Sequence, residues 1–166
     1  SKVYPEGGGV RGFSVEIRQG EFFALLGPSG CGKTTTLRVI AGLETPDSGK
    51  LFFGDRDVIA LPPEKRNAAM VFQSYALFPH MTVLENVALG GYGRSRSGVL
   101  QAVLRLDRAE ERQLFAEAEA QLARIGITDR LDELAGNLAL GPQRLMEIAR
   151  ALATDPALLL LDEPAA

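Results

Sequence analysis

The sequence has little of what stabilises small secreted domains or anchors a chain in a membrane. Its 166 residues include one cysteine, Cys31, which has no partner for a disulfide or a metal site. Apolar runs such as residues 157–161 fall far short of the about 20 residues that a membrane-spanning helix needs. These absences favour a reducing, cytoplasmic compartment and leave only indirect contact with a membrane.

The chain also lacks an excess of one charge sign. Its 18 lysines and arginines are interspersed with 21 aspartates and glutamates, so no basic block indicates a nucleic-acid partner and none is expected. The only histidine is His80, for which we favour packing or a protein contact over catalysis. With 46% hydrophobic residues, the chain is large enough to form one domain with its own core.

The spacing of apolar residues predicts alternating strands and helices. Short apolar or alternating runs bounded by turn residues predict strands at residues 10–17, 21–26, 50–53, 57–59, 68–72 and 157–161, and Gly54-Asp55 predicts a hairpin between the third and the fourth. Apolar residues recurring every three or four positions predict helices at residues 33–41, 107–125 and 142–153, and one or two helical turns are expected at residues 83–89. In the last helix the residues expected on the apolar face are Leu145, Ile148, Ala149 and Leu152. Glycine, serine and arginine interleaved over residues 90–98 predict an exposed loop.

This order predicts an α/β fold. We expect a P-loop NTPase core with a mainly parallel sheet, an antiparallel β portion near the amino end, and a helical subdomain over about residues 82–153. The chain starts at Ser1 without a methionine and stops at Ala166 directly after a motif. We therefore expect residues 1–166 to be a single ATPase domain that is truncated at both ends.

A complete phosphate-binding pattern joins the predicted strand 21–26 to the helix 33–41. In it, glycines let backbone N–H groups turn towards phosphate oxygens, a lysine reaches the β- and γ-phosphates, and a threonine ligates magnesium. The predicted ligands are ATP and Mg²⁺. The residues assigned to nucleotide binding are Gly27, Pro28, Ser29, Gly30, Cys31, Gly32, Lys33, Thr34 and Thr35.

Two carboxylates follow the last predicted strand. Asp162 is predicted to hold the magnesium ion through water, and Glu163 to act as general base on the attacking water. Alone, such a pair more often begins a solvated loop. Beside a complete P-loop, the catalytic interpretation is favoured.

With these motifs the chain resembles the ATP-binding subunits of ABC transporters over nearly its whole length. The resemblance implies that Tyr4 stacks on adenine and that Gln73 is the Q-loop glutamine, which contacts magnesium and water. It also implies catalytic roles for Glu163, Gln73 and Lys33, and metal-site roles for Thr34, Gln73 and Asp162. For Tyr4 an exposed turn aromatic is an equally good interpretation.

One family motif is altered. In the family, a Leu-Ser-Gly-Gly-Gln motif contacts the nucleotide that a partner subunit binds. At this position the present chain has the signature-like residues Leu138, Ala139, Leu140, Gly141 and Pro142. Ala139 lacks the hydroxyl donor, and Pro142 lacks both the side-chain amide and a backbone N–H. A simple helix-cap role for Gly141 and Pro142 stays an open alternative.

The resemblance differs between the two halves. Residues 20–90 are similar to importers of sugars, polyamines or ferric iron, whereas the sequence from Arg94 onward is more similar to importers of branched-chain amino acids. The chain is thus either a divergent member or a joined sequence.

The resemblance implies a function in transport. Two such subunits would sandwich two ATP molecules and drive transmembrane permease subunits, from a peripheral position on the inner face of the cell membrane. Two alternatives remain open: a soluble ABC-type ATPase outside transport, and a nucleotide-binding fragment without turnover, which the altered signature favours.

Overall fold

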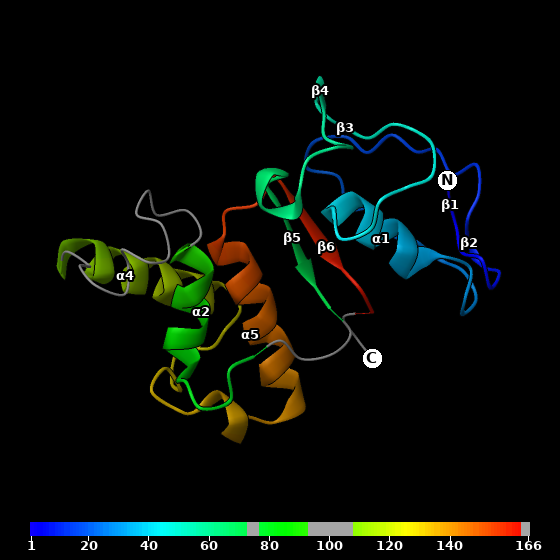
Figure 1. The fold of residues 1–166 in the computed structure, drawn as a ribbon. Coiled ribbons are helices and arrows are strands. Elements are labelled where there is room, and N and C mark those ends of the chain that lie inside the picture. Colours follow the sequence, from blue (N-terminus) through cyan, green and yellow to red (C-terminus); the bar gives the residue numbers. More distant parts are fainter. Residues whose placement is uncertain (73–76, 93–107, 164–166) are drawn as a thin grey trace. The chain divides into compact units, whose positions relative to one another are not determined.

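A computed structural model describes residues 1–72, 77–92 and 108–163 (Figure 1). The chain divides into two compact units, Ser1–Arg66 and Asn67–Ala166, here called the N-terminal and C-terminal units. Across the described ranges, no helix combines the length and apolarity needed to cross a membrane.

The N-terminal unit contains two short antiparallel pairs and one helix. Its elements are β1 (Lys2–Val3), β2 (Gly9–Val10), α1 (Lys33–Ala41), β3 (Phe52–Phe53), β4 (Arg56–Asp57) and the 3-10 turn η1 (Pro63–Lys65). β1 pairs with β2, and β3 pairs with β4 across the predicted Gly54-Asp55 turn. The hairpin is therefore confirmed, with shorter strands than expected.

Helix α1 has the predicted boundaries. It ends at Gly42, whose φ of 84° lies in the left-handed region that glycine adopts at little cost. The Gly42 N–H donates to the carbonyls of Arg38 and Val39, which closes the last turn.

Two predicted strands of this unit are wrong. Residues 21–26 form no strand, and of residues 10–17 only Val10 belongs to one. The apolar side chains there stay accessible: Phe13 is 44% exposed and Leu26 is 91% exposed. An apolar run gives a segment strand propensity, but a strand forms only beside a hydrogen-bonding neighbour, and within this unit residues 21–26 pair with none.

The C-terminal unit contains a parallel strand pair. β5 (Ala68–Val71) pairs with β6 (Leu158–Leu161) from Ala68 opposite Leu158 to Val71 opposite Leu161. The Asp162 N–H donates to the Val71 carbonyl at 3.0 Å, which continues the ladder by one residue. Both predicted strands are confirmed.

Three helices pack together in this unit, as Figure 1 shows: α2 (Val83–Tyr92), α4 (Arg108–Arg124) and α5 (Leu140–Ala153). A second 3-10 turn, η2 (Ala135–Asn137), precedes α5. Their shared core consists of Val83, Val87, Ala88, Ala118, Leu122, Ile127, Ala135, Leu138, Met146, Ala149 and Ala153.

The start of α2 has a capping box. The Thr82 hydroxyl accepts from the Glu85 N–H at 3.1 Å, and the Glu85 carboxylate accepts from the Thr82 N–H at 2.8 Å. The helix runs to Tyr92, so the first residues of the loop predicted at 90–98 are helical. Residues 93–98 lie outside the described ranges.

Helix α5 is buried more broadly than its sequence pattern indicates. Leu145, expected on the buried face, is 41% exposed, whereas Met146 is fully buried. The difference arises because α5 packs against α2 and α4 on one side and against β5 on another. The buried apolar contact surfaces of α5 therefore consist of alanine and methionine side chains.

Candidate functional site

The predicted phosphate loop leads into the amino end of α1. Gly32 is the N-cap residue, and no side chain caps the helix there. The first N–H groups of a helix have no partner within the helix, and they form its positive end. No acidic side chain occupies the first turn of α1, so this end suits an anion.

Glycines are required at two points of the loop. Gly30 and Gly32 have φ values of 80° and 96°, which L side chains rarely adopt. At Gly32 an added Cβ would also clash with Val10 and would lie 2.8 Å from the Gly9 carbonyl oxygen. The loop therefore packs closely against β2, and only glycine fits there.

The Lys33 side chain folds over the loop. Its ammonium donates to the Gly27 carbonyl at 2.8 Å and to the Pro28 carbonyl at 3.1 Å. Its Nζ also lies 4.0 Å from the Cys31 sulfur, whose residue is exposed. An exposed glycine-rich loop thus holds a cation through its own carbonyls, an arrangement that fits the binding of a phosphate chain.

The remaining nucleotide-binding residues lie around this loop. Thr34 and Thr35 are in the first turn of α1, with Thr34 exposed and Thr35 half-buried. Tyr4 lies in the turn between β1 and β2, and its ring is 5.7 Å from the Lys2 ammonium. β2 packs against Gly32 of the phosphate loop. The strand pair that carries the Tyr4 turn therefore contacts this loop within the N-terminal unit.

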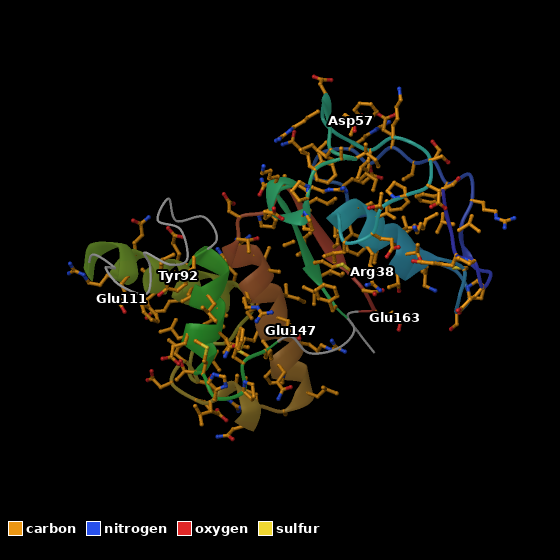
Figure 2. All side chains as sticks on the ribbon, in the orientation of Figure 1. Arg38, Asp57, Tyr92, Glu111, Glu147 and Glu163 are labelled. Atoms are coloured by element: carbon orange, nitrogen blue, oxygen red, sulfur yellow. The ribbon has the colours of Figure 1, made fainter. Side chains whose placement is uncertain are left out.

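The carboxylate pair lies in the C-terminal unit at the carboxyl end of β6, where Figure 2 labels Glu163. Asp162 is 5% exposed, whereas Glu163 is exposed. Glu163 has a φ of 50°, uncommon for a residue that is neither glycine nor asparagine. Such backbone strain concentrates at functional sites.

Gln73 lies outside the described residues, but both flanks of its segment are described. The Phe72 carbonyl accepts from the Arg144 guanidinium at 3.2 Å. On the other flank, the Arg150 guanidinium lies 6.0 Å from the centre of the Phe78 ring. Burial lowers the pKa of Arg150, and the carboxylate of Glu147 partly offsets this. Helix α5 thus contacts the chain on both sides of Gln73.

The signature-like residues form the start of α5. Ala139 is the N-cap residue without a side-chain cap, and Leu140, Gly141 and Pro142 form the first turn, two residues earlier than predicted. Leu138 is buried in the helical core, while Leu140 is 54% exposed. The Gln143 amide donates to the Leu138 carbonyl at 2.9 Å. Gln143 therefore joins the start of α5 to the residue that precedes its N-cap.

The described residues contain no group of three histidine, cysteine or acidic side chains that could enclose a metal. Magnesium is usually held by one or two carboxylates together with substrate phosphates and water. Thr34 beside the phosphate loop and Asp162 after β6 are donors of this oxygen type. Each of these two oxygen donors, taken within its own unit, therefore suits a magnesium ion by its chemistry.

Two positioning residues have no sequence signal. Arg144 contacts the Phe72 carbonyl, and Arg66 contacts the end of α1. Both lie in segments where charged residues are frequent, and neither belongs to a spaced pattern. Only the folded contacts distinguish them from solvated arginines.

A glycine-rich loop that opens a helix, together with a parallel strand pair ending in two carboxylates, defines a P-loop nucleotide-binding protein. Residues 10–166 match the family described as ABC transporter. The chain therefore belongs to the ABC transporter family.

Curated relatives and solved structures agree with this assignment. The chain is 48% identical to the spermidine/putrescine import ATP-binding protein PotA of Thermobifida fusca, over 99% of this chain and 40% of the relative. It is 48% identical to the Fe(3+) ions import ATP-binding protein FbpC of Agrobacterium fabrum, over 91% of this chain and 39% of the relative. MJ1267, an ATP-binding cassette of an ABC transporter, superposes with a TM-score of 0.80 at 28% identity, over 99% of this chain and 66% of that one.

The predicted α/β P-loop fold is confirmed by these neighbours, which include the dimeric bacterial cassette MJ0796 at a TM-score of 0.73 and 30% identity, over 90% of this chain and 63% of that one. The chain spans about 40% of the length of the curated relatives named above.

Proposed function

We propose that this chain binds ATP with Mg²⁺ and hydrolyses it as the ATPase subunit of an ABC-type importer. The observation that carries the proposal is the uncapped amino end of α1, preceded by glycines in left-handed conformations and covered by the Lys33 ammonium. These groups offer several N–H donors and one cation to a triphosphate. We assign phosphate contacts to residues 27–35 and adenine stacking to Tyr4.

In the proposed reaction, water attacks the γ-phosphorus and the bond to the leaving ADP oxygen breaks. Glu163 accepts the proton of the water, and Lys33 stabilises the negative charge on the transferred group. Bound magnesium supplies further charge neutralisation at the phosphates. Thr34 and Asp162 are proposed to hold it, with Gln73 contacting both metal and water.

We propose that residues 1–166 belong to one ABC-type ATPase domain, with a helical subdomain over about residues 82–153. The proposed partners are a second ATPase subunit and transmembrane permease subunits. The signature-like residues of this chain would contact the nucleotide that the second ATPase subunit binds. This assembly would place the chain peripherally on the inner face of the cell membrane. The named import functions of the relatives support this role.

A second candidate function is nucleotide binding without turnover. Ala139 and Pro142 favour it, because the first turn of α5 has neither a capping hydroxyl nor an N–H at Pro142. In this case ATP would act as a ligand that orders the chain.

The test combines ATP affinity with magnesium-dependent phosphate release in the wild type, Lys33→Ala and Glu163→Gln. We expect Lys33→Ala to weaken ATP binding, and Glu163→Gln to retain binding while turnover falls by about 10² to 10⁴. Lys65→Met is the charge control, because Lys65 is exposed in η1. Binding without phosphate release above the Glu163→Gln background would select the second candidate. No ATP binding by the folded wild type would contradict both.

A further inference from the structure

Arg66 is a buried cation at the opposite end of α1 from the phosphate loop. Its residue is 4% exposed, and its guanidinium makes four hydrogen bonds of 3.1 Å or less to backbone carbonyls. Two of these carbonyls, on Val39 and Ile40, belong to the last turn of α1. The other two, on Ile59 and Leu61, belong to the segment that follows β4.

The charge of Arg66 is balanced in an unusual way. Buried cations are normally paired with carboxylates, but the hydrogen bonds given for the Arg66 guanidinium all go to carbonyl oxygens, and burial lowers the pKa of Arg66. The negative partner is instead the carboxyl end of α1, where the carbonyl oxygens of the last turn form the negative end of the helix dipole. Arg66 thus occupies the negative end of the helix whose positive end opens at Gly32.

The surrounding sequence makes room for this contact. At Gly42 an added Cβ would lie 2.6 Å from the Arg66 Nε atom. Gly42 therefore has two roles: it ends α1 in a left-handed conformation and leaves space for the guanidinium.

Within the N-terminal unit, helix α1 buries little of its own surface completely. It has nine residues, and Ala41 is its only buried side chain. Isolated helices of this length are marginal in water and depend on tertiary contacts. A side chain that joins the last turn to a separate segment fixes both the tilt of the helix and the position of its amino end.

We propose that Arg66 is a positioning residue for the phosphate-binding loop, acting through α1. The inference rests on the proposed function, since it assumes that the amino end of α1 receives the nucleotide phosphates. Arg66 does not contact the nucleotide. It holds the loop in the geometry that the triphosphate requires, where a displacement of about 1 Å is enough to weaken a site.

The test uses Arg66→Met, which keeps an apolar stem of similar length but removes all the donors. The measured quantity is the ratio of the dissociation constants for AMP and for ATP, alongside the urea midpoint of each variant. A purely structural defect lowers the fraction of competent protein, which weakens both nucleotides equally and leaves the ratio unchanged. A misplaced loop weakens ATP more than AMP.

We expect the AMP-to-ATP ratio to fall about tenfold in Arg66→Met and to fall less in Arg66→Lys, whose single ammonium cannot hold both segments. Lys65→Met removes the same charge from the neighbouring exposed residue and should leave the ratio unchanged. An unchanged ratio in folded Arg66→Met would overturn the proposal. If Arg66→Met does not fold, an unchanged ratio in Arg66→Lys would overturn it. Failure of the wild type to bind ATP would instead contradict the proposed function.

Discussion

The two units of the chain are stabilised by different means. In the N-terminal unit, Ala41 and Val58 are the buried apolar side chains, and polar contacts such as those of Arg66 and Asp47 join its segments. In the C-terminal unit, three helices enclose a continuous apolar core. Since apolar burial is the dominant stabilising term in folding, the C-terminal unit has the more robust fold.

The difference bears on function, because the phosphate loop belongs to the unit with the smaller core. Ligand binding stabilises the folded form of the site that it occupies. We therefore expect nucleotide to order the N-terminal unit more than the C-terminal unit.

The largest expected effect comes from the helical core. Leu122→Ala removes a fully buried side chain and should lower the free energy of unfolding by about 2 to 5 kcal/mol. The same substitution at Leu26, which is 91% exposed, should change it by less than about 0.5 kcal/mol. Urea unfolding of both variants measures the contrast. Equal losses of unfolding free energy in the two variants would contradict the conclusion that the C-terminal unit has the larger stabilising core.

The second largest loss of stability is expected at Asn86, a polar residue that joins segments of the C-terminal unit. The fully buried Asn86 amide accepts from the Phe78 N–H and donates to the carbonyls of Phe78, Met81 and Thr82. Asn86→Ala removes the acceptor of the Phe78 N–H and one of the donors to each of the three carbonyls, and it should cost about 2 to 3 kcal/mol in urea unfolding. Asn137→Ala, at an exposed position of η2, is the matched control. A loss no larger than that of the control would contradict the anchoring role.

A smaller effect is expected at the capping box of α2. Thr82→Ala removes the acceptor for the Glu85 N–H and should cost about 1 kcal/mol. Because Glu85 completes the reciprocal pair, the double variant with Glu85→Ala should lose less than the sum of the single losses. Additive losses from thermal unfolding would argue against a coupled box.

The smallest effect concerns pH and the N-terminal unit. The Val3 N–H, which donates to Asp47 at 2.7 Å, lowers the pKa of that carboxyl below 3.8, and the Lys2 ammonium adds to this. The resulting stability is complete above pH 3.8 and is lost as the pH falls through the lower folded pKa. We expect Asp47→Asn to flatten this acid-side decline in the urea midpoint. A decline as steep as in the wild type would contradict the assignment.

The sequence alone predicted most features that depend on local pattern. The boundaries of α1, the Gly54-Asp55 hairpin and the strands at residues 68–72 and 157–161 all follow from periodicity and turn residues. The glycine-rich loop before α1 follows a spacing set by the geometry of phosphate binding, and its contacts with a nucleotide stay a prediction.

Features that depend on neighbours distant in sequence were not predictable. The strand expected at residues 21–26 lacks a pairing partner in its unit. On α5, Met146 is fully buried, whereas Leu145, which was expected on the apolar face, is largely exposed. Arg66 and Arg144 act through backbone carbonyls, which any residue supplies, so no side-chain pattern marks their partners.

The central proposal is that the backbone amides of residues 29–35 bind the nucleotide phosphates. Hydrogen exchange of the wild type with and without Mg-ATP tests this residue by residue. We expect slower exchange at these amides on ATP addition, little change in the buried core around Leu122 and Met146, and no slowing in Lys33→Ala. Unchanged exchange at residues 29–35 under saturating Mg-ATP would contradict it.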